Sequence, residues 1–292
     1  MRRIIATEPK YLLRIVVYEL LLTGGAISVM GDMDFRNRLG LLIRKEGLEL
    51  ISDAYVALSG LGGVGGVAFQ ALVRSGVRRF RLAENGIFDP PDMNRQPGAT
   101  LSTIGRKKLE VYDEWARSIN PNIELQRYDE GINIDNIEEF LHGTDVYIGA
   151  IDVEKGQDVK DKGADIARKY CIPLFTSGVV GFGALMVNHH PAKMTPAEFW
   201  NKALPRGGKD GLGIYADHFQ PEIISRLYQG VLSGTVPSTT IGVNLAGTVV
   251  ANEVINYFLQ PLSDISREPL FAPNYLVIDL SNFSMTTASI ED

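Results

Sequence analysis

Short apolar segments alternate with segments of helical spacing from residue 54 to residue 178 of this chain. The apolar segments have the length of strands, and the intervening ones repeat apolar residues every three or four positions, as amphipathic helices do. Strands joined by helices of this length need crossover connections, which make neighbouring strands parallel. The sequence therefore predicts an α/β fold with a Rossmann-like, doubly wound, mainly parallel sheet and helices on both faces. The expected strands are 54–60, 78–84, 123–130, 145–152 and 172–178.

The C-terminal part of the chain departs from this alternation. Residues 238–259 predict a long apolar helix that begins at a serine or threonine cap, and 275–280 predict a late strand that extends the sheet. The proline-rich and glycine-rich region 181–236 is expected to shape a substrate site. We expect residues 34–292 to form a single domain, preceded by an N-terminal extension, 1–33, that faces an oligomer partner.

Composition narrows the possible partners and the compartment. The 292 residues carry a net charge of −6, with a pI of about 5.4, so there is no basic excess to attract nucleic acid or an anionic membrane. The apolar stretch 11–30 is interrupted by Arg14, Glu19 and Gly24, which argues against a membrane helix. The single cysteine, Cys171, excludes a disulfide within this chain and fits a reducing cytoplasm. Because it precedes a predicted strand, it is expected to be buried.

The strongest local signal is the segment 60–65, GLGGVG, which follows a predicted strand and opens a predicted helix. Glycines allow a sharp turn and a close approach of phosphate, and the free amides of a helix start favour negative charge. We therefore expect Gly60, Gly62, Gly63 and Gly65 to bind a nucleotide. Taken alone, the segment is equally typical of NAD or FAD sites, and a tight turn without a ligand is the structural alternative.

Further polar and glycine residues follow this segment in an ordered pattern. They are Glu84, Asp92, Arg95 and Gln96 after the second strand, Gly105 and Lys108 before the next helix, and Asp152 after the fourth strand. With this order and spacing, the sequence resembles the ThiF and MoeB family of ubiquitin-activating-enzyme-like proteins over about residues 35 to 260. The resemblance implies an ATP-dependent adenylyltransferase that uses ATP and Mg²⁺ to activate a carboxylate.

The residue types support that chemistry independently of the resemblance. Glu84, at the carboxyl end of the second strand, is placed to accept hydrogen bonds from a ribose. Arg95 and Lys108 are cations expected to face one crevice, which suits a triphosphate better than a dinucleotide. Asp152 offers a hard oxygen ligand to Mg²⁺ held through ATP. We expect the last three to be catalytic; the alternatives are a loop carboxylate for Glu84, surface charges for the two cations and a helix cap for Asp152.

The resemblance also assigns residues that the pattern alone does not explain. It implies nucleotide contacts for Asp92 and Gln96, and an arginine donated by a neighbouring subunit, which would be Arg36 or Arg38. That arginine implies a homodimer, whereas solvation of a helix end is its alternative role. The sequence departs from the family pattern at three places: the first acidic residue is a glutamate, Gly86 replaces a second aspartate, and the family's asparagine is Asp92.

These residues predict attack by a carboxylate oxygen on the α-phosphorus of ATP, with release of pyrophosphate. The acceptor would be a small molecule, a peptide or a carrier-protein tail, and a modified nucleoside is a further candidate. Because Cys171 is the only cysteine, neither a thioester relay nor a cysteine zinc site is expected. Two alternatives stay open: an NAD- or FAD-dependent oxidoreductase, and a catalytically inactive nucleotide-binding partner subunit, for which Gly86 is the main support.

Overall fold

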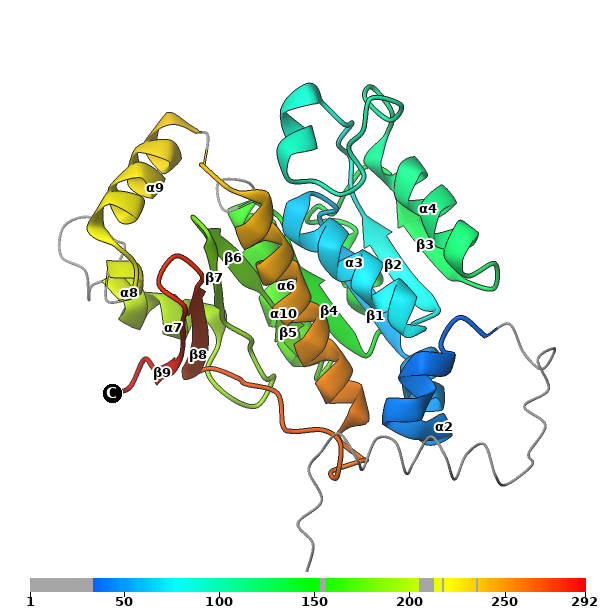
Figure 1. The fold of residues 1–292 in the computed structure, drawn as a ribbon. Coiled ribbons are helices and arrows are strands. Elements are labelled where there is room, and N and C mark those ends of the chain that lie inside the picture. The colour runs from blue at the N-terminus through cyan, green and yellow to red at the C-terminus, as the bar shows by residue number, and fades with distance from the viewer. Residues whose placement is uncertain (1–33, 153–155, 205–212, 217, 235) are drawn as a thin grey trace, which may run out of the picture.

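The described strands form two sheets that lie side by side (Figure 1). A computed structural model describes residues 34–152, 156–204, 213–216, 218–234 and 236–292. The first sheet is parallel throughout and has the strand order β3-β2-β1-β4-β5, which confirms the doubly wound prediction. Its strands are β1 (Tyr55–Ser59), β2 (Arg79–Ala83), β3 (Glu124–Tyr128), β4 (Val146–Gly149) and β5 (Leu174–Phe175).

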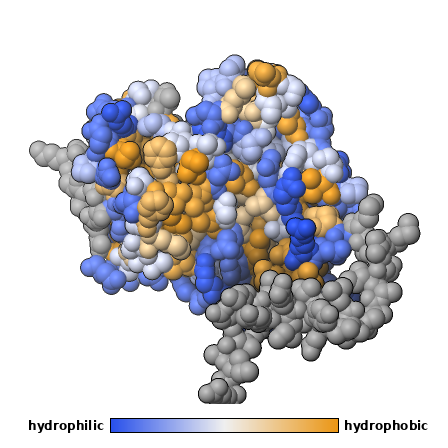
Figure 2. Space-filling view, in the orientation of Figure 1, coloured by the Kyte–Doolittle hydropathy of each residue, from blue (hydrophilic) through white to orange (hydrophobic). Residues whose placement is uncertain are grey.

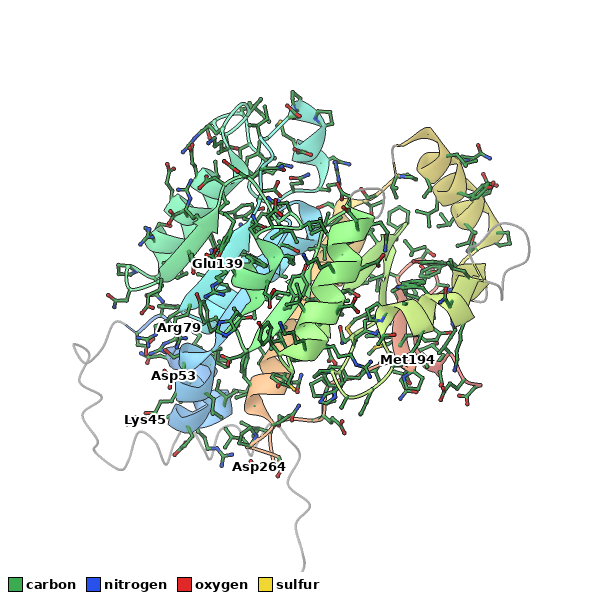
Figure 3. The ribbon with its side chains drawn as sticks, turned by 180° about the vertical axis from the view of Figure 1, so that it is seen from behind. Lys45, Asp53, Arg79, Glu139, Met194 and Asp264 are labelled. Atoms are coloured by element: carbon green, nitrogen blue, oxygen red, sulfur yellow. The ribbon has the colours of Figure 1, made fainter. Side chains whose placement is uncertain are left out.

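Helices cover both faces of the parallel sheet (Figures 1 and 3). Along β1, Val56 and Leu58 join one hydrophobic cluster and Ala57 joins another, because successive side chains of a strand point to opposite faces. The first cluster includes α2, α3, α4 and α10, and the second includes α5 and α6. These helices are α2 (Asn37–Asp53), α3 (Gly63–Ser75), α4 (Lys108–Ile119), α5 (Ile137–Leu141), α6 (Gln157–Lys169) and α10 (Thr240–Leu259).

The predicted C-terminal extension takes the form of a second, antiparallel sheet. The late strand that the sequence indicates is β8, and Ile278 in it lies opposite Ala184 of β7. An isolated bridge between Leu174 and His189 connects this sheet to β5. The strand order is β6-β7-β8-β9, with β6 (Ser177–Val180), β7 (Gly183–Met186), β8 (Asn274–Asp279) and β9 (Ser284–Ser289).

Region 181–236 supplies β7 and the helices that cover the outer face of the second sheet. Phe199 and Leu227 pack with Val277 in one cluster on that face. On the opposite face, α10 packs against Leu276 in another cluster. The second sheet is therefore enclosed between α10 and the helices α7 (Pro196–Ala203), α8 (Gly213–Ala216) and α9 (Pro221–Ser233).

The long helix α10 begins where the sequence predicts a cap. The hydroxyl oxygen of Thr239 accepts a hydrogen bond from the backbone N–H of Gly242 at 3.0 Å. The same hydroxyl donates to the carbonyl of Gly181 at 2.7 Å. This threonine therefore fixes the start of α10 against the turn between β6 and β7.

Cys171 is exposed, so the prediction that it is buried was wrong. It follows α6 in a left-handed conformation with φ of 57°. The amides of Cys171 and Ile172 bond to the carbonyls of Arg168 and Ala167, which is the Schellman arrangement of a helix end. The residue thus belongs to the helix cap, and the buried strand begins only after it.

The N-terminal extension 1–33 lies outside the described residues, and its expected role at an oligomer interface stays a prediction. None of the described helices has both the length and the apolar character that crossing a bilayer requires.

Candidate functional site

The glycine turn lies at the carboxyl end of β1, between β1 and α3. Gly60 has a φ of 87°, and a Cβ atom there would lie 2.4 Å from the carbonyl oxygen of Ala150. A Cβ atom at Gly65 would lie 1.8 Å from the carbonyl oxygen of Gly60. Both positions therefore require glycine for the turn itself, before any ligand is considered.

The start of α3 is open to an anion. Gly62 is the N-cap residue, and no described side chain caps the helix. Uncapped amides in the first turn carry the positive end of the helix dipole, which favours a phosphate. The turn lies beside α10, since a Cβ atom at Gly63 would lie 2.8 Å from Val243.

This turn also lies at the point where the strand order reverses. From β1 the chain continues to β2 and β3 on one side, and later places β4 and β5 on the other. Crevices at such a reversal, outside the carboxyl ends of the strands, are where open α/β sheets bind ligands.

Glu84 connects the glycine turn to the loop that follows β2. One carboxylate oxygen accepts a hydrogen bond from the N–H of Leu61 at 2.7 Å, and the other accepts one from the N–H of Gly86 at 2.7 Å. A Cβ atom at Gly86 would lie 2.9 Å from the nearer of these oxygens and 3.3 Å from Cε of Lys108. The glutamate and the glycine are therefore matched, because a second aspartate at position 86 would crowd the longer acidic side chain.

The side chain of Asp92 contacts both predicted cations, Lys108 and Arg95. Its carboxylate lies 3.2 Å from Nζ of Lys108 and 3.6 Å from a guanidinium nitrogen of Arg95, and it accepts a 2.5 Å hydrogen bond from the side-chain amide of Gln96. The side chains of Lys108 and Asp92 are 13% and 12% exposed, whereas that of Arg95 is 31% exposed. The structure thus brings these four residues into one cluster, with Arg95 nearest to solvent.

Gln96 links this cluster to the glycine turn. A Cβ atom at Gly62 would lie 3.7 Å from the amide nitrogen of Gln96. Its side-chain oxygen is buried without a hydrogen-bond partner among the described residues. A buried carbonyl oxygen without a partner is costly, so this atom suits a donor supplied by water or a ligand.

Asp152 lies across the reversal from the glycine turn. It follows β4, whose residue Gly149 is paired with Ser59 of β1, and it is exposed. Its backbone carbonyl accepts a hydrogen bond from Lys160 at 3.1 Å. An exposed carboxylate at this edge fits Mg²⁺ held mainly by phosphate oxygens and water, since that ion usually keeps only one or two protein carboxylates.

Arg36 and Arg38 lie away from the crevice within one chain. Arg36 forms a 2.7 Å ion pair with Asp34, which lowers the pKa of that carboxyl, and it packs beside Gly76 at the end of α3. This is the end of α3 opposite the glycine turn. Arg38 is exposed on the first turn of α2. A single chain does not bring either arginine to the other site residues, so their role across an interface stays a prediction.

Two residues that sequence reasoning missed contact the segments that form the candidate site. The amide nitrogen of Asn94 donates to the carbonyl of Ser238 at 3.5 Å, which connects the Arg95 loop to the start of α10. Tyr112 is buried beneath the turn, and a Cβ atom at Gly66 would lie 2.0 Å from its hydroxyl. Burial raises the pKa of Tyr112, so the hydroxyl stays neutral. In the sequence, only Gly66, one more glycine after the turn, indicated that a close contact such as that with Tyr112 would form here.

Comparison with known proteins gives matches of sequence and of fold. The model of the ThiF family matches residues 36–292. The tRNA threonylcarbamoyladenosine dehydratase of Bacillus subtilis (strain 168) is 38% identical over 117 residues, which cover 40% of this chain and 46% of that protein. The protein of the same name from Escherichia coli (strain K12) is 34% identical over 161 residues, 53% of this chain and 58% of that protein. The chain thus spans about half the length of these relatives.

Among solved structures, E. coli MccB with ATP is similar in fold. The TM-score is 0.67, with 17% sequence identity, and the match covers 89% of this chain and 72% of that chain.

Proposed function

This chain belongs to the ThiF family, and on that premise we propose that it binds ATP and activates a carboxylate as an acyl-adenylate. The observation that carries the proposal is the cluster around Asp92, which holds Lys108 and Arg95 and reaches the uncapped start of α3 through Gln96. Two cations in one cluster with the free amides of that helix would provide the charge that a triphosphate needs. The solved MccB structure with ATP has the same fold and supports this choice of nucleotide.

In the proposed reaction, a carboxylate oxygen attacks the α-phosphorus of ATP. The bond between that phosphorus and the oxygen bridging to the β-phosphate breaks, and pyrophosphate leaves with the electron pair. Lys108 and Arg95 stabilise the charge that develops on the leaving group, so catalysis depends on positioning rather than on a proton-transfer base. The glycine turn and Gln96 hold the phosphates, and Glu84 is close enough to the turn to receive the ribose.

Mg²⁺ would be held by Asp152 together with the phosphates, and it would supply further neutralisation of their charge. The role of Asp152 in this chain is to present a carboxylate across the strand reversal from the glycine turn.

The relatives and region 181–236 bear on the class of acceptor. The two dehydratase relatives are named for a modified nucleoside of tRNA, which supports a carboxylate carried by such a nucleoside. A peptide or a carrier-protein tail presents the same group, and region 181–236 would select among them. We also propose a cytoplasmic homodimer in which Arg36 or Arg38 reaches the partner's crevice.

The test is ATP–pyrophosphate exchange with the purified chain, magnesium and a panel of carboxylates. We expect exchange that depends on one acceptor class and falls at least about a hundredfold in Asp152→Ala, as for loss of a residue that acts in the transition state. The matched control is Asp158→Ala, which removes an exposed carboxylate in the first turn of α6 and should leave exchange unchanged. NAD or FAD binding without ATP binding would instead favour the oxidoreductase alternative.

A further inference from the structure

Asp92 places a negative charge inside the cluster that is proposed to bind phosphate. The residue is 8% exposed, and its carboxylate is held from several sides. Lys108 contacts one oxygen at 3.2 Å, and the same oxygen accepts the backbone N–H of Asp89 at 3.2 Å. The other oxygen accepts the side-chain amide of Gln96 at 2.5 Å. This carboxylate is thus held in the loop by contacts from three residues.

We propose that Asp92 is a positioning residue that holds Lys108 and partly cancels its charge, so that the site binds the pyrophosphate product less tightly. This inference rests on the proposed adenylation. With Asp92, the three charged side chains Arg95, Lys108 and Asp92 sum to one positive charge. With a neutral asparagine at position 92 they would sum to two, and a highly charged leaving group would be held more tightly.

The size of the effect follows from the depth of the cluster. Salt screens partly buried charges less than exposed ones, and the side chains of Asp92 and Lys108 are 12% and 13% exposed. One unit of charge in a partly buried site, at the effective dielectric of a site near a protein surface, is expected to change the affinity for a highly charged anion by at least about tenfold. The charge of Arg95 is cancelled less, because its guanidinium lies farther from Asp92, at 3.6 Å, and its side chain is 31% exposed.

The test is calorimetric binding of inorganic pyrophosphate to the full chain, compared between wild type and Asp92→Asn. We expect the variant to bind pyrophosphate about tenfold more tightly. The control is Asp89→Asn, which removes one negative charge from an exposed residue of the same loop while keeping a good N-cap residue, and it should change the affinity less than twofold. Asp92→Ser is the second neutral variant, and it should tighten binding in the same direction.

A double-mutant cycle separates this role from a merely structural one. If Asp92 acts through Lys108, the tightening caused by Asp92→Asn should largely disappear in a Lys108→Gln background. Equal or weaker pyrophosphate binding by both neutral variants would overturn the inference while leaving adenylation intact. Failure of the wild type to bind either ATP or pyrophosphate would instead remove the proposed function, and this inference with it.

Discussion

Gly60 is a residue where the backbone, rather than a ligand, dictates the choice of glycine. Its φ of 87° is a conformation that side-chain-bearing residues rarely adopt. A Cβ atom added there would lie 2.4 Å from the carbonyl oxygen of Ala150, so there is no space for a side chain. Gly60→Ala should therefore lower the free energy of unfolding by roughly 2–4 kcal/mol, as strain and a backbone clash combine. Gly143→Ala is the control, because Gly143 has a φ of 82° but nothing within 4 Å of its built Cβ atom. It should cost roughly 1 kcal/mol in urea denaturation, and equal costs for the two would refute the clash.

The pairing of Glu84 with Gly86 explains two departures from the family pattern together. Gly86→Asp should weaken ATP binding, because the new side chain would crowd Glu84. A Cβ atom added at position 86 would lie 2.9 Å from one carboxylate oxygen of that residue. In a Glu84→Asp background, the shorter acid leaves room, and the loss should be smaller by at least about 1 kcal/mol. Titration calorimetry of the four proteins measures this coupling. Additive effects would show that the two positions are independent.

At the scale of elements, the contact between α3 and α10 depends on small residues. A Cβ atom at Gly247 of α10 would lie 2.5 Å from Val67 and 2.7 Å from the carbonyl oxygen of Val64. Alanine favours a helix over glycine, so the local effect of Gly247→Ala is stabilising. Overpacking should outweigh it, and we expect a net loss of roughly 1–3 kcal/mol in thermal unfolding. Thr248→Ala, at the exposed neighbour, should stay within about 0.5 kcal/mol; a stabilising Gly247→Ala would contradict the close packing.

Strands β1 and β4 are short apolar runs, whereas β2 and β3 mix apolar with charged residues; all four lie within the predicted ranges. The segment 172–178 was predicted as one strand, but the chain leaves the parallel sheet after Phe175 and enters the second sheet at Ser177. No local signal marks this change, because it is set by pairing with β7, which in turn pairs with distant β8. The exposure of Cys171 could not be predicted for a related reason, because the cap of α6 and the buried strand β5 are only a few residues apart there.

The placement of the candidate site residues in the fold was more predictable than their contacts. Glu84 and Asp152 follow neighbouring parallel strands, whose carboxyl ends share one edge of the sheet, so their common location could be expected from the sequence. The contacts of Asp92 with Lys108 and Arg95 could not be predicted, because they depend on how the loop after β2 folds back toward α4.

At the scale of the whole molecule, His189 connects the two sheets and makes stability depend on pH. Burial lowers the pKa of His189 to about 4, against 6.5 in an unfolded chain. Below pH 6.5 the unfolded state binds a proton that the folded state does not, so the stability present above that pH is lost as pH falls toward 4, by up to about 1.4 kcal/mol per pH unit. His189→Gln should flatten this dependence in denaturation at pH 7 and pH 5. The control His142→Gln replaces an exposed histidine and should leave this pH dependence unchanged. Identical pH dependence of stability in the wild type and both variants would exclude His189 as the cause.

The position at which ATP is cleaved tests the central claim most directly. Purified chain would be incubated with ATP, magnesium and the acceptor identified by exchange, and the products would be followed by phosphorus NMR. Activation of a carboxylate as an acyl-adenylate predicts pyrophosphate together with the acyl-adenylate anhydride, or AMP after its breakdown, with no ADP. ADP and inorganic phosphate as the products would contradict it, because they would place the attack on the γ-phosphorus instead of the α-phosphorus.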